Sequence, residues 1–184
     1  MPESEQRGAD NSFLRFVETA EERARAELVD YGGNSVVALS LLMRRVNKLM
    51  AVDAEQVVLG PHNLTWASFR VCFALWVAGP QEPHRVAIST SMSRASVSAA
   101  RKALVDKGYV TTASSPSDLR SIVMSLTPEG YRQITEIYQR HLQLTAEWLE
   151  PLSAPEQQIL LGLLGKIMAS PRGQIFGPGR AVNN

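Results

Sequence analysis

Hydroxyl and cationic side chains recur in the middle of the chain at spacings suited to binding a polyanion. They belong to Ser93, Arg94, Ser96, Ser98, Arg101 and Lys102. Arg can donate two hydrogen bonds to a guanine edge, Lys neutralises phosphate, and short side chains let a helix enter a groove. Residues 84–120 hold six basic and two acidic residues, a net charge of +4, although the whole chain carries only +1. The pattern favours recognition of nucleic acid, and an ordinary solvated helix surface is the alternative.

A helix is expected to carry these side chains, because apolar residues recur beneath them at helical spacing. Val97, Ala100 and Leu104 are separated by three and four residues and form one seam. Ser93 is suited to the N-cap of this helix, and Gly108 is suited to its C-terminal turn. The seam would be buried, so the hydroxyls and cations would lie on the opposite, exposed face.

The hydrophobic period changes from helical to alternating after this helix. Residues 109–113 and 121–126 are rich in β-branched and aromatic side chains, and residues 114–120 between them are rich in turn formers. A hairpin is therefore expected, and a very short helix is expected at 83–89. Short helix, turn, helix and hairpin predict a winged helix-turn-helix, which makes the solvated-surface interpretation the less favoured one.

The tip of the predicted hairpin carries two residues that can contact DNA. Arg120 can enter a minor groove beside the major-groove helix, because narrow minor grooves attract Arg. Asp118 can hold the guanidinium group of Arg120 in place through a bidentate pair. A surface ion pair that contributes little to stability is the alternative for these two residues.

Most of the remaining chain is predicted to be helical, so the fold class is mainly α with a small β-hairpin. Periodicity and capping residues predict further helices over 13–28, 35–58, 66–78, 128–150 and 154–168. Residues 1–11 are polar without periodicity, and the tail from Ser170 is rich in Gly and Pro, so both ends are expected to be irregular.

Three motifs, in their order and spacing, resemble the MarR family, the multiple-antibiotic-resistance-type regulators of bacteria. They are Ser93-Arg94-Ala95-Ser96-Val97-Ser98, Leu104 to Gly108-Tyr109-Val110, and Asp118-Leu119-Arg120 followed by Leu126-Thr127-Pro128-Glu129-Gly130. The resemblance extends from about Ser35 to Met168. In the family, the first motif begins the recognition helix, and the last marks the end of the wing and the turn into the long dimerisation helix.

The resemblance implies a regulator that binds double-stranded DNA as a homodimer, with two winged helices in successive major grooves of a pseudo-palindromic operator. It implies repression or activation that a small molecule relieves, and the favoured form is a repressor that is released by a small aromatic or apolar effector. The implied organisation is an N-terminal extension at 1–34 that packs across the dimer, helical dimerisation segments at 35–60 and 128–170, a winged helix-turn-helix at 61–127, and a loose tail at 171–184.

The chain departs from the family pattern at several basic positions. Leu119 replaces the middle base of an Asp-Arg-Arg wing motif, Ala99 stands where the family often has Arg, and Thr111 and Thr112 replace bases of the first hairpin strand. Each lost phosphate contact is expected to weaken binding and to flatten its salt dependence by about one unit of slope.

Four aromatic residues form a stripe along the predicted helix 66–78, and the resemblance implies an effector site near them. They are Trp66, Phe69, Phe73 and Trp76, and His62 is the nearby polar group. Such a stripe could line a pocket for a flat, apolar ligand. An ordinary hydrophobic core is the more common role, and the two are compatible because a pocket can open within a core.

Other classes of function find little support in the sequence. Cys72 is the single cysteine, and its apolar surroundings favour a packing role over redox sensing. No glycine-rich phosphate loop, nucleophile motif or metal-ligand spacing is present, so neither an enzyme nor a cofactor or metal is expected.

The polar N-terminus and the lack of a long apolar run predict a cytoplasmic protein without a membrane segment. A winged-helix adaptor that binds protein through residues 13–28 is the alternative to a DNA-binding regulator.

Replacement of Arg120 by Ala is expected to weaken operator binding by about 1–3 kcal/mol, because one groove contact is lost. Fluorescence anisotropy with a labelled operator duplex measures the change. An unchanged affinity would remove the wing from the DNA interface.

Overall fold

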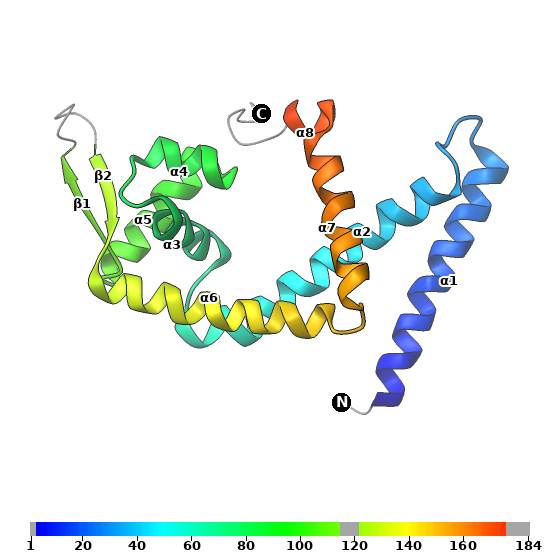
Figure 1. Ribbon diagram of the computed structural model, residues 1–184, viewed down its shortest axis with the longest axis horizontal. Helices are drawn as coiled ribbons and strands as arrows, with labels where there is room; N and C mark the ends of the chain where they lie inside the picture. The colour runs from blue at the N-terminus through cyan, green and yellow to red at the C-terminus, as the bar shows by residue number, and fades with distance from the viewer. Residues whose placement is uncertain (1–2, 115–121, 176–184) are drawn as a thin grey trace. The chain divides into compact units, whose positions relative to one another are not determined.

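The computed structural model describes residues 3–114 and 122–175 of the chain (Figure 1). Contacts divide the protein into two units, Met1–Val52 and Asp53–Asn184, and each is considered by itself. None of the helices in the described parts is both long enough and apolar enough to cross a bilayer. The expectation of a mainly helical protein with one β-hairpin is confirmed.

The first unit contains two helices, α1 (Glu3–Glu27) and most of α2 (Asn34–Ala54). Val17 and Ala24 of α1 are buried, and the guanidinium group of Arg45 lies 5.1 Å from the ring centroid of Phe13. The expectation of an irregular segment over 1–11 is wrong, because α1 already begins at Glu3. This segment lacks apolar periodicity but is rich in Glu, Gln, Arg and Ala, whose helix propensity is high.

The α2 helix ends four residues earlier than its hydrophobic pattern suggests. A π-helical turn, η1 (Glu55–Leu59), and a 3₁₀ turn, η2 (Gly60–His62), follow it, and Asn63 then adopts a left-handed conformation with φ 50°. The π turn keeps Val58 and Leu59 buried, so the apolar pattern continues although the α-helical hydrogen bonding does not.

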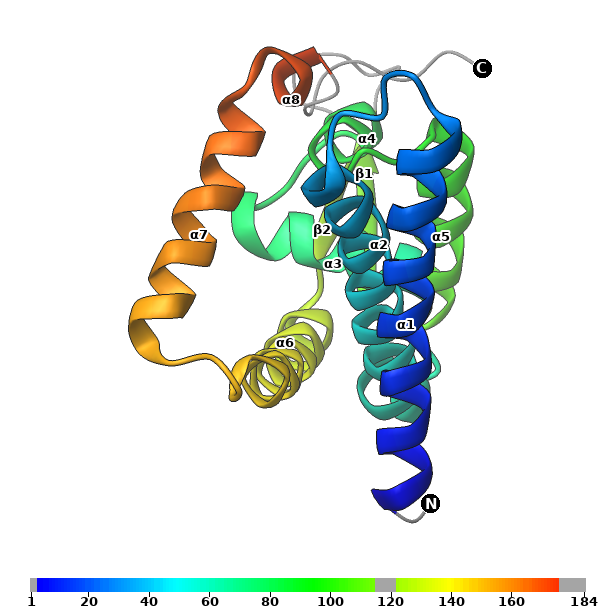
Figure 2. The ribbon, with the colours of Figure 1, turned by 90° about the vertical axis from the view of Figure 1, so that its right-hand side faces the viewer.

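The second unit contains the winged helix and three further helices. The bounds are α3 (Trp66–Ala78), α4 (Pro83–Thr90), α5 (Arg94–Asp106), β1 (Val110–Ser114), β2 (Ile122–Leu126), α6 (Pro128–Leu149), α7 (Ala154–Ala169) and α8 (Pro171–Ile175). The hairpin lies at one end of α6, and α7 leaves the other end (Figures 1 and 2). The helix α8 contradicts the expectation of a loose tail over 171–175.

Capping residues fix the starts of the helices around the winged helix, as the sequence predicts. The Oγ1 atom of Thr65 accepts a hydrogen bond from Ser68 N at 3.1 Å, and the Oγ atom of Ser93 accepts one from Ser96 N at 3.0 Å. At the start of α7, Ser153 N donates to the carboxylate of Glu156 at 2.8 Å. Each bond satisfies a backbone N–H that the helix itself leaves unpaired.

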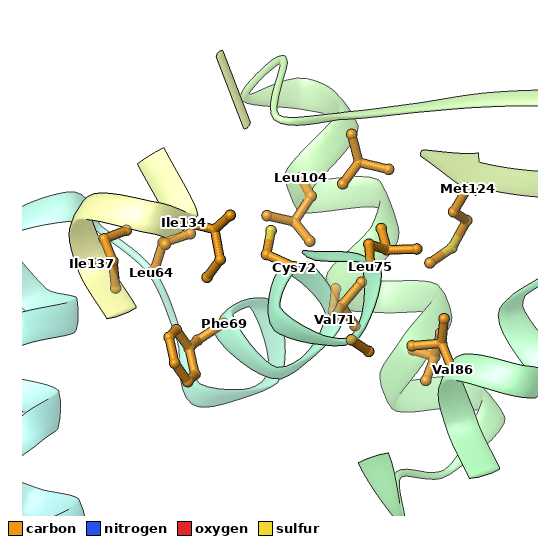
Figure 3. Close-up of a cluster of buried hydrophobic side chains, with 14 of the residues drawn as sticks. Leu64, Phe69, Val71, Cys72, Leu75, Val86, Leu104, Met124, Ile134 and Ile137 are labelled. Carbon is orange, nitrogen blue, oxygen red and sulfur yellow. The ribbon is translucent and has the colours of Figure 1, made fainter. Parts of the chain in front are cut away.

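One aliphatic core joins α3 to every other part of the winged helix (Figure 3). Its fully buried side chains include Leu59, Val71, Cys72, Val86, Val97, Leu104, Met124, Ile134 and Ile137. The hairpin strands pair antiparallel, with Val110 opposite Leu126. Gln81 adds a bridge that the sequence did not reveal, because its N atom donates to Met124 O at 3.0 Å and its O atom accepts from Met124 N at 2.8 Å.

The α7 helix has no buried residue. Its large apolar side chains are between 38% and 64% exposed, and they are Ile159, Leu160, Leu161, Leu163, Leu164, Ile167 and Met168. An uncovered apolar surface of this kind is typical of an interface with another chain.

Replacement of Leu104 by Ala is expected to lower the free energy of unfolding by about 3 kcal/mol, because this fully buried side chain would leave a cavity. Val105→Ala is the control, since its neighbouring side chain is 41% exposed and its loss should cost less than about 1 kcal/mol. Urea unfolding at one protein concentration compares the two. Equal losses would contradict the placement of the α5 seam in the core.

Candidate nucleic-acid interface

The two sides of α5 differ sharply in exposure and chemistry. Val97, Ala100 and Leu104 are buried, as the seam predicts. The side chains on the outer face are exposed or half-buried, and they include Ser93, Arg94, Ser96, Ser98, Arg101 and Lys102. All six candidate residues of this helix therefore stay outside the core, and Ser98, Arg101 and Lys102 line one hollow.

A hollow of about 640 Å³ lies over this outer face. Its lining includes Ala95, Ser98, Ala99, Arg101 and Lys102 from α5 and Thr112 from β1. Small side chains form the floor, so another molecule can approach the α5 backbone closely. The cations stand beside this floor, which is the arrangement that a major-groove helix requires.

The cations of α5 are available for an outside partner. Arg94, Arg101 and Lys102 make no ion pair with any side chain in the described parts of the chain. Asp106 lines the same hollow near the end of α5 and would repel a phosphate there. The N-terminal part of α5 is therefore better suited to contact DNA, a limit that the sequence pattern alone did not reveal.

The turn between α4 and α5 has an unusual backbone that fixes the entry of α5. Ser91 adopts φ 52°, in the left-handed region that is uncommon for a residue with a side chain. The backbone N–H of Met92 donates to Ala87 O at 3.0 Å, and the guanidinium group of Arg70 donates to Thr90 O. Arg70 of α3 thus binds the end of α4, a role that its sequence position did not suggest.

The two candidate residues of the wing, Asp118 and Arg120, lie outside the described residues. The strands that lead to and from them are described, and they extend the sheet away from α6 (Figure 1). Thr112 of β1 lines the hollow together with residues of α5. The role of these two residues stays a prediction.

The aromatic residues of the candidate effector site form a cluster between α3 and α6. Rings from α3 contact one another, and Tyr138 of α6 lies 4.7 Å from Phe73 and 5.5 Å from Trp76 between ring centroids. His141 of α6 lies 5.7 Å from both Trp66 and Phe69. The rings thus pack directly against one another. A flat ligand could enter between the rings only if α3 and α6 moved apart.

The two histidines near this region have different surroundings. His62 makes a hydrogen bond through Nδ1 with Gln133 Oε1 at 3.2 Å, which ties η2 to α6. His141 lies among rings, and desolvation lowers its pKa below the usual value. His141 is consequently neutral at pH 7 and packs as an aromatic ring.

The single cysteine belongs to the core rather than to a reactive site. Cys72 is 2% exposed and faces the side chains of α5 in the core (Figure 3). Burial raises the pKa of its thiol to about 12. Because the reactive species is the thiolate, Cys72 is unsuited to redox or metal chemistry at neutral pH.

The comparisons with known proteins point to transcriptional regulators. Residues 64–122 match the model of the MarR family. The HTH-type transcriptional regulator YwaE of Bacillus subtilis is 29% identical over 131 residues, which cover 71% of this chain and 77% of that protein.

Solved structures with the same fold include a regulator bound to operator DNA and a regulator controlled by a small molecule. A mutant MarR from E. coli complexed with operator DNA has a TM-score of 0.66 and 25% identity, over 76% of this chain and 99% of that one. BpsR of Bordetella bronchiseptica, whose DNA binding is regulated by 6-hydroxynicotinic acid, has a TM-score of 0.64 and 24% identity, over 72% of this chain and 94% of that one.

The short α4 helix, the turn, the exposed α5 face and the antiparallel wing define a winged helix-turn-helix protein of the DNA-binding class. With the matches above, the chain is similar to transcriptional regulators of the MarR family, whose model covers residues 64–122.

Cys72 in the folded protein is expected to resist alkylation at pH 8, well below the pKa of its buried thiol. Its reaction with iodoacetamide should be at least about a hundredfold slower than in urea, where the thiol recovers a pKa of about 8.5. Mass spectrometry of timed samples measures both rates. Comparable rates would mean that Cys72 is accessible after all.

Proposed function

We propose that the protein is a homodimeric repressor that binds a pseudo-palindromic operator and is released by a small aromatic or apolar effector. As a regulator of bacterial type it would act in the cytoplasm, where the chromosome lies. The observation that carries the DNA-binding part is the outer face of α5, a hollow floored by small side chains and bordered by cations that make no ion pair within the described residues.

The proposed DNA contacts divide into two groups. Ser96, Ser98 and Arg101 would meet base edges and phosphates in the major groove, and Arg94 and Lys102 would neutralise phosphates. The hydroxyl of Ser93 is only partly available to DNA, because it also caps α5. Asp118 and Arg120 would serve the minor groove from the wing. The operator complex of E. coli MarR supports this mode of binding.

The exposed apolar side chains of α7 support assembly with a second copy. Val36, Leu39, Met43 and Val46 of α2 are also about half exposed, so the first unit has uncovered apolar surface of its own. The proposed dimerisation segments, 35–60 and 128–170, contain both surfaces. The role of the N-terminal extension, 1–34, would be to enlarge this interface.

The effector would act at the aromatic cluster of Trp66, Phe69, Phe73 and Trp76, with His62 at its edge. BpsR, which responds to an aromatic acid, supports an effector of this chemical class. Because the rings contact α6 as well as each other, an effector that enters would change the distance between α3 and α6. Such a change would move the winged helix relative to the dimer.

A selection from a random DNA pool tests the proposal. The purified protein should enrich one pseudo-palindromic duplex and bind it at least about a thousandfold more tightly than a scrambled duplex. Affinity should fall steeply between about 50 and 200 mM salt. Enrichment of no sequence would favour the alternative, a winged-helix adaptor that binds protein through the exposed apolar residues of α1.

Ser98→Glu is expected to weaken binding to the selected duplex about a hundredfold, because it adds a negative charge inside the hollow. Ala103→Glu is the matched control: it adds the same charge to α5 at an exposed position outside the lining of the hollow. Anisotropy titrations of both variants give the comparison. Equal effects would mean that net charge, and not the α5 face, controls binding.

A further inference from the structure

One hydroxyl group joins the end of the recognition helix to the start of α6. The Oγ1 atom of Thr127 donates a hydrogen bond to Gly108 O at 2.7 Å and accepts one from Gly130 N at 2.9 Å. The second bond is an ordinary N-cap of α6. The first bond is different, because it reaches across to the residue that follows α5.

Backbone contacts strengthen the same junction. Thr127 N donates to Tyr109 O at 3.0 Å, and Tyr109 N donates to Leu104 O at 2.9 Å inside α5. Gly108, which directly precedes Tyr109, has φ 71°, a left-handed conformation that suits Gly. The last turn of α5, the first residues of the wing and the first turn of α6 are therefore tied together.

The close approach at this junction requires Gly130. A Cβ atom at this position would lie 1.9 Å from the carbonyl oxygen of Tyr109, a backbone atom that cannot move alone. The hydrogen bonds of Thr127 and this close approach form what we call the α5–α6 junction, made by Gly108, Tyr109, Thr127 and Gly130.

The junction attaches the first turn of α6 to the winged helix. Further along α6, Ile134, Ile137 and Tyr138 pack against the core and the rings of α3, and Thr135 accepts a hydrogen bond from Trp76. A helix that is held along its middle can still tilt at its first turn, whereas a helix that is also held there has a fixed direction. The junction thus helps to fix the angle between α6 and the recognition helix.

We propose that the Thr127 hydroxyl is a positioning group. Through the α5–α6 junction, it sets the half-site spacing that the dimer accepts. This inference depends on the proposed dimeric operator complex. The α6 helix has 22 residues and is about 33 Å long, so a tilt of about 6° displaces its end by roughly 3.4 Å, one base-pair step.

Two substitutions of Thr127 separate positioning from capping. Thr127→Ser keeps a hydroxyl that can make both bonds. Thr127→Asp keeps an excellent N-cap acceptor for Gly130 N, but a carboxylate has no proton to donate to Gly108 O. The probes are the selected duplex and two derivatives in which its half-sites are one base pair closer and one base pair further apart.

The wild-type protein and Thr127→Ser are expected to prefer the selected spacing about tenfold or more over both derivatives. Thr127→Asp is expected to reduce this preference to about twofold. The added charge and any loss of folded protein lower the affinity for the three duplexes alike, so neither changes the ratio. A merely structural role of Thr127 would leave the ratio at its wild-type value.

The outcomes distinguish this inference from the proposed function. If the wild type discriminates between spacings and Thr127→Asp discriminates equally, the positioning role is overturned and the operator complex stands. If the wild type binds all spacings alike, the dimeric operator complex fails, and the positioning role fails with it.

Gly130→Ala is the second variant, and it decides the matter if Thr127→Asp does not fold. Ala favours a helix more than Gly does, so its expected effect comes from the contact with Tyr109 O. It should also broaden the accepted spacing, and a wild-type ratio in this folded variant would overturn the proposal.

Discussion

Burial of one side of α5 against α3 is the interaction on which the rest of the structure depends. Val97, Ala100 and Leu104 lie in the core beside Val71 and Cys72, and this fixes which residues of α5 remain outside. A rotation of α5 by one residue would turn Ser98 towards the core and an apolar side chain towards solvent. The free energy of burying the seam is therefore also what orients the basic face.

The α3 helix connects this interaction to the long α6 helix. Its aliphatic side contacts the seam of α5, and its aromatic side contacts Tyr138 and His141 of α6. Because one rigid helix has both contacts, a displacement of α6 against the rings is passed to the basic face without any change within α5. Packed side chains resist compression, so small displacements are transmitted rather than absorbed.

Features with local causes could be predicted from the sequence. The caps at Thr65, Ser93 and Thr127, the seam of α5 and the change of period after Gly108 each depend on residues close together in the chain. These features were enough to define the winged helix. The position of the six candidate residues outside the core follows from the seam in the same way.

Features with distant causes could not be predicted. The bridge of Gln81 to Met124, the hydrogen bond of Arg70 to Thr90 O and the presence of Asp106 in the hollow depend on residues brought together by folding. The π turn at Glu55–Leu59 keeps the apolar pattern of an α-helix, so periodicity cannot detect it. The helix over residues 3–11 shows the opposite case, because its helix propensity is high although the apolar periodicity that predicts a helix is absent.

The bare surface of α7 has a consequence for how the chain becomes ordered. A helix of 16 residues without a buried side chain gains little from its own chain, and isolated helices of this length are marginal in water. Its order must therefore come from the surface that covers it. In the proposed dimer, ordering of α7 and association would form a single equilibrium, in which dilution would unwind the helix as it separates the two copies.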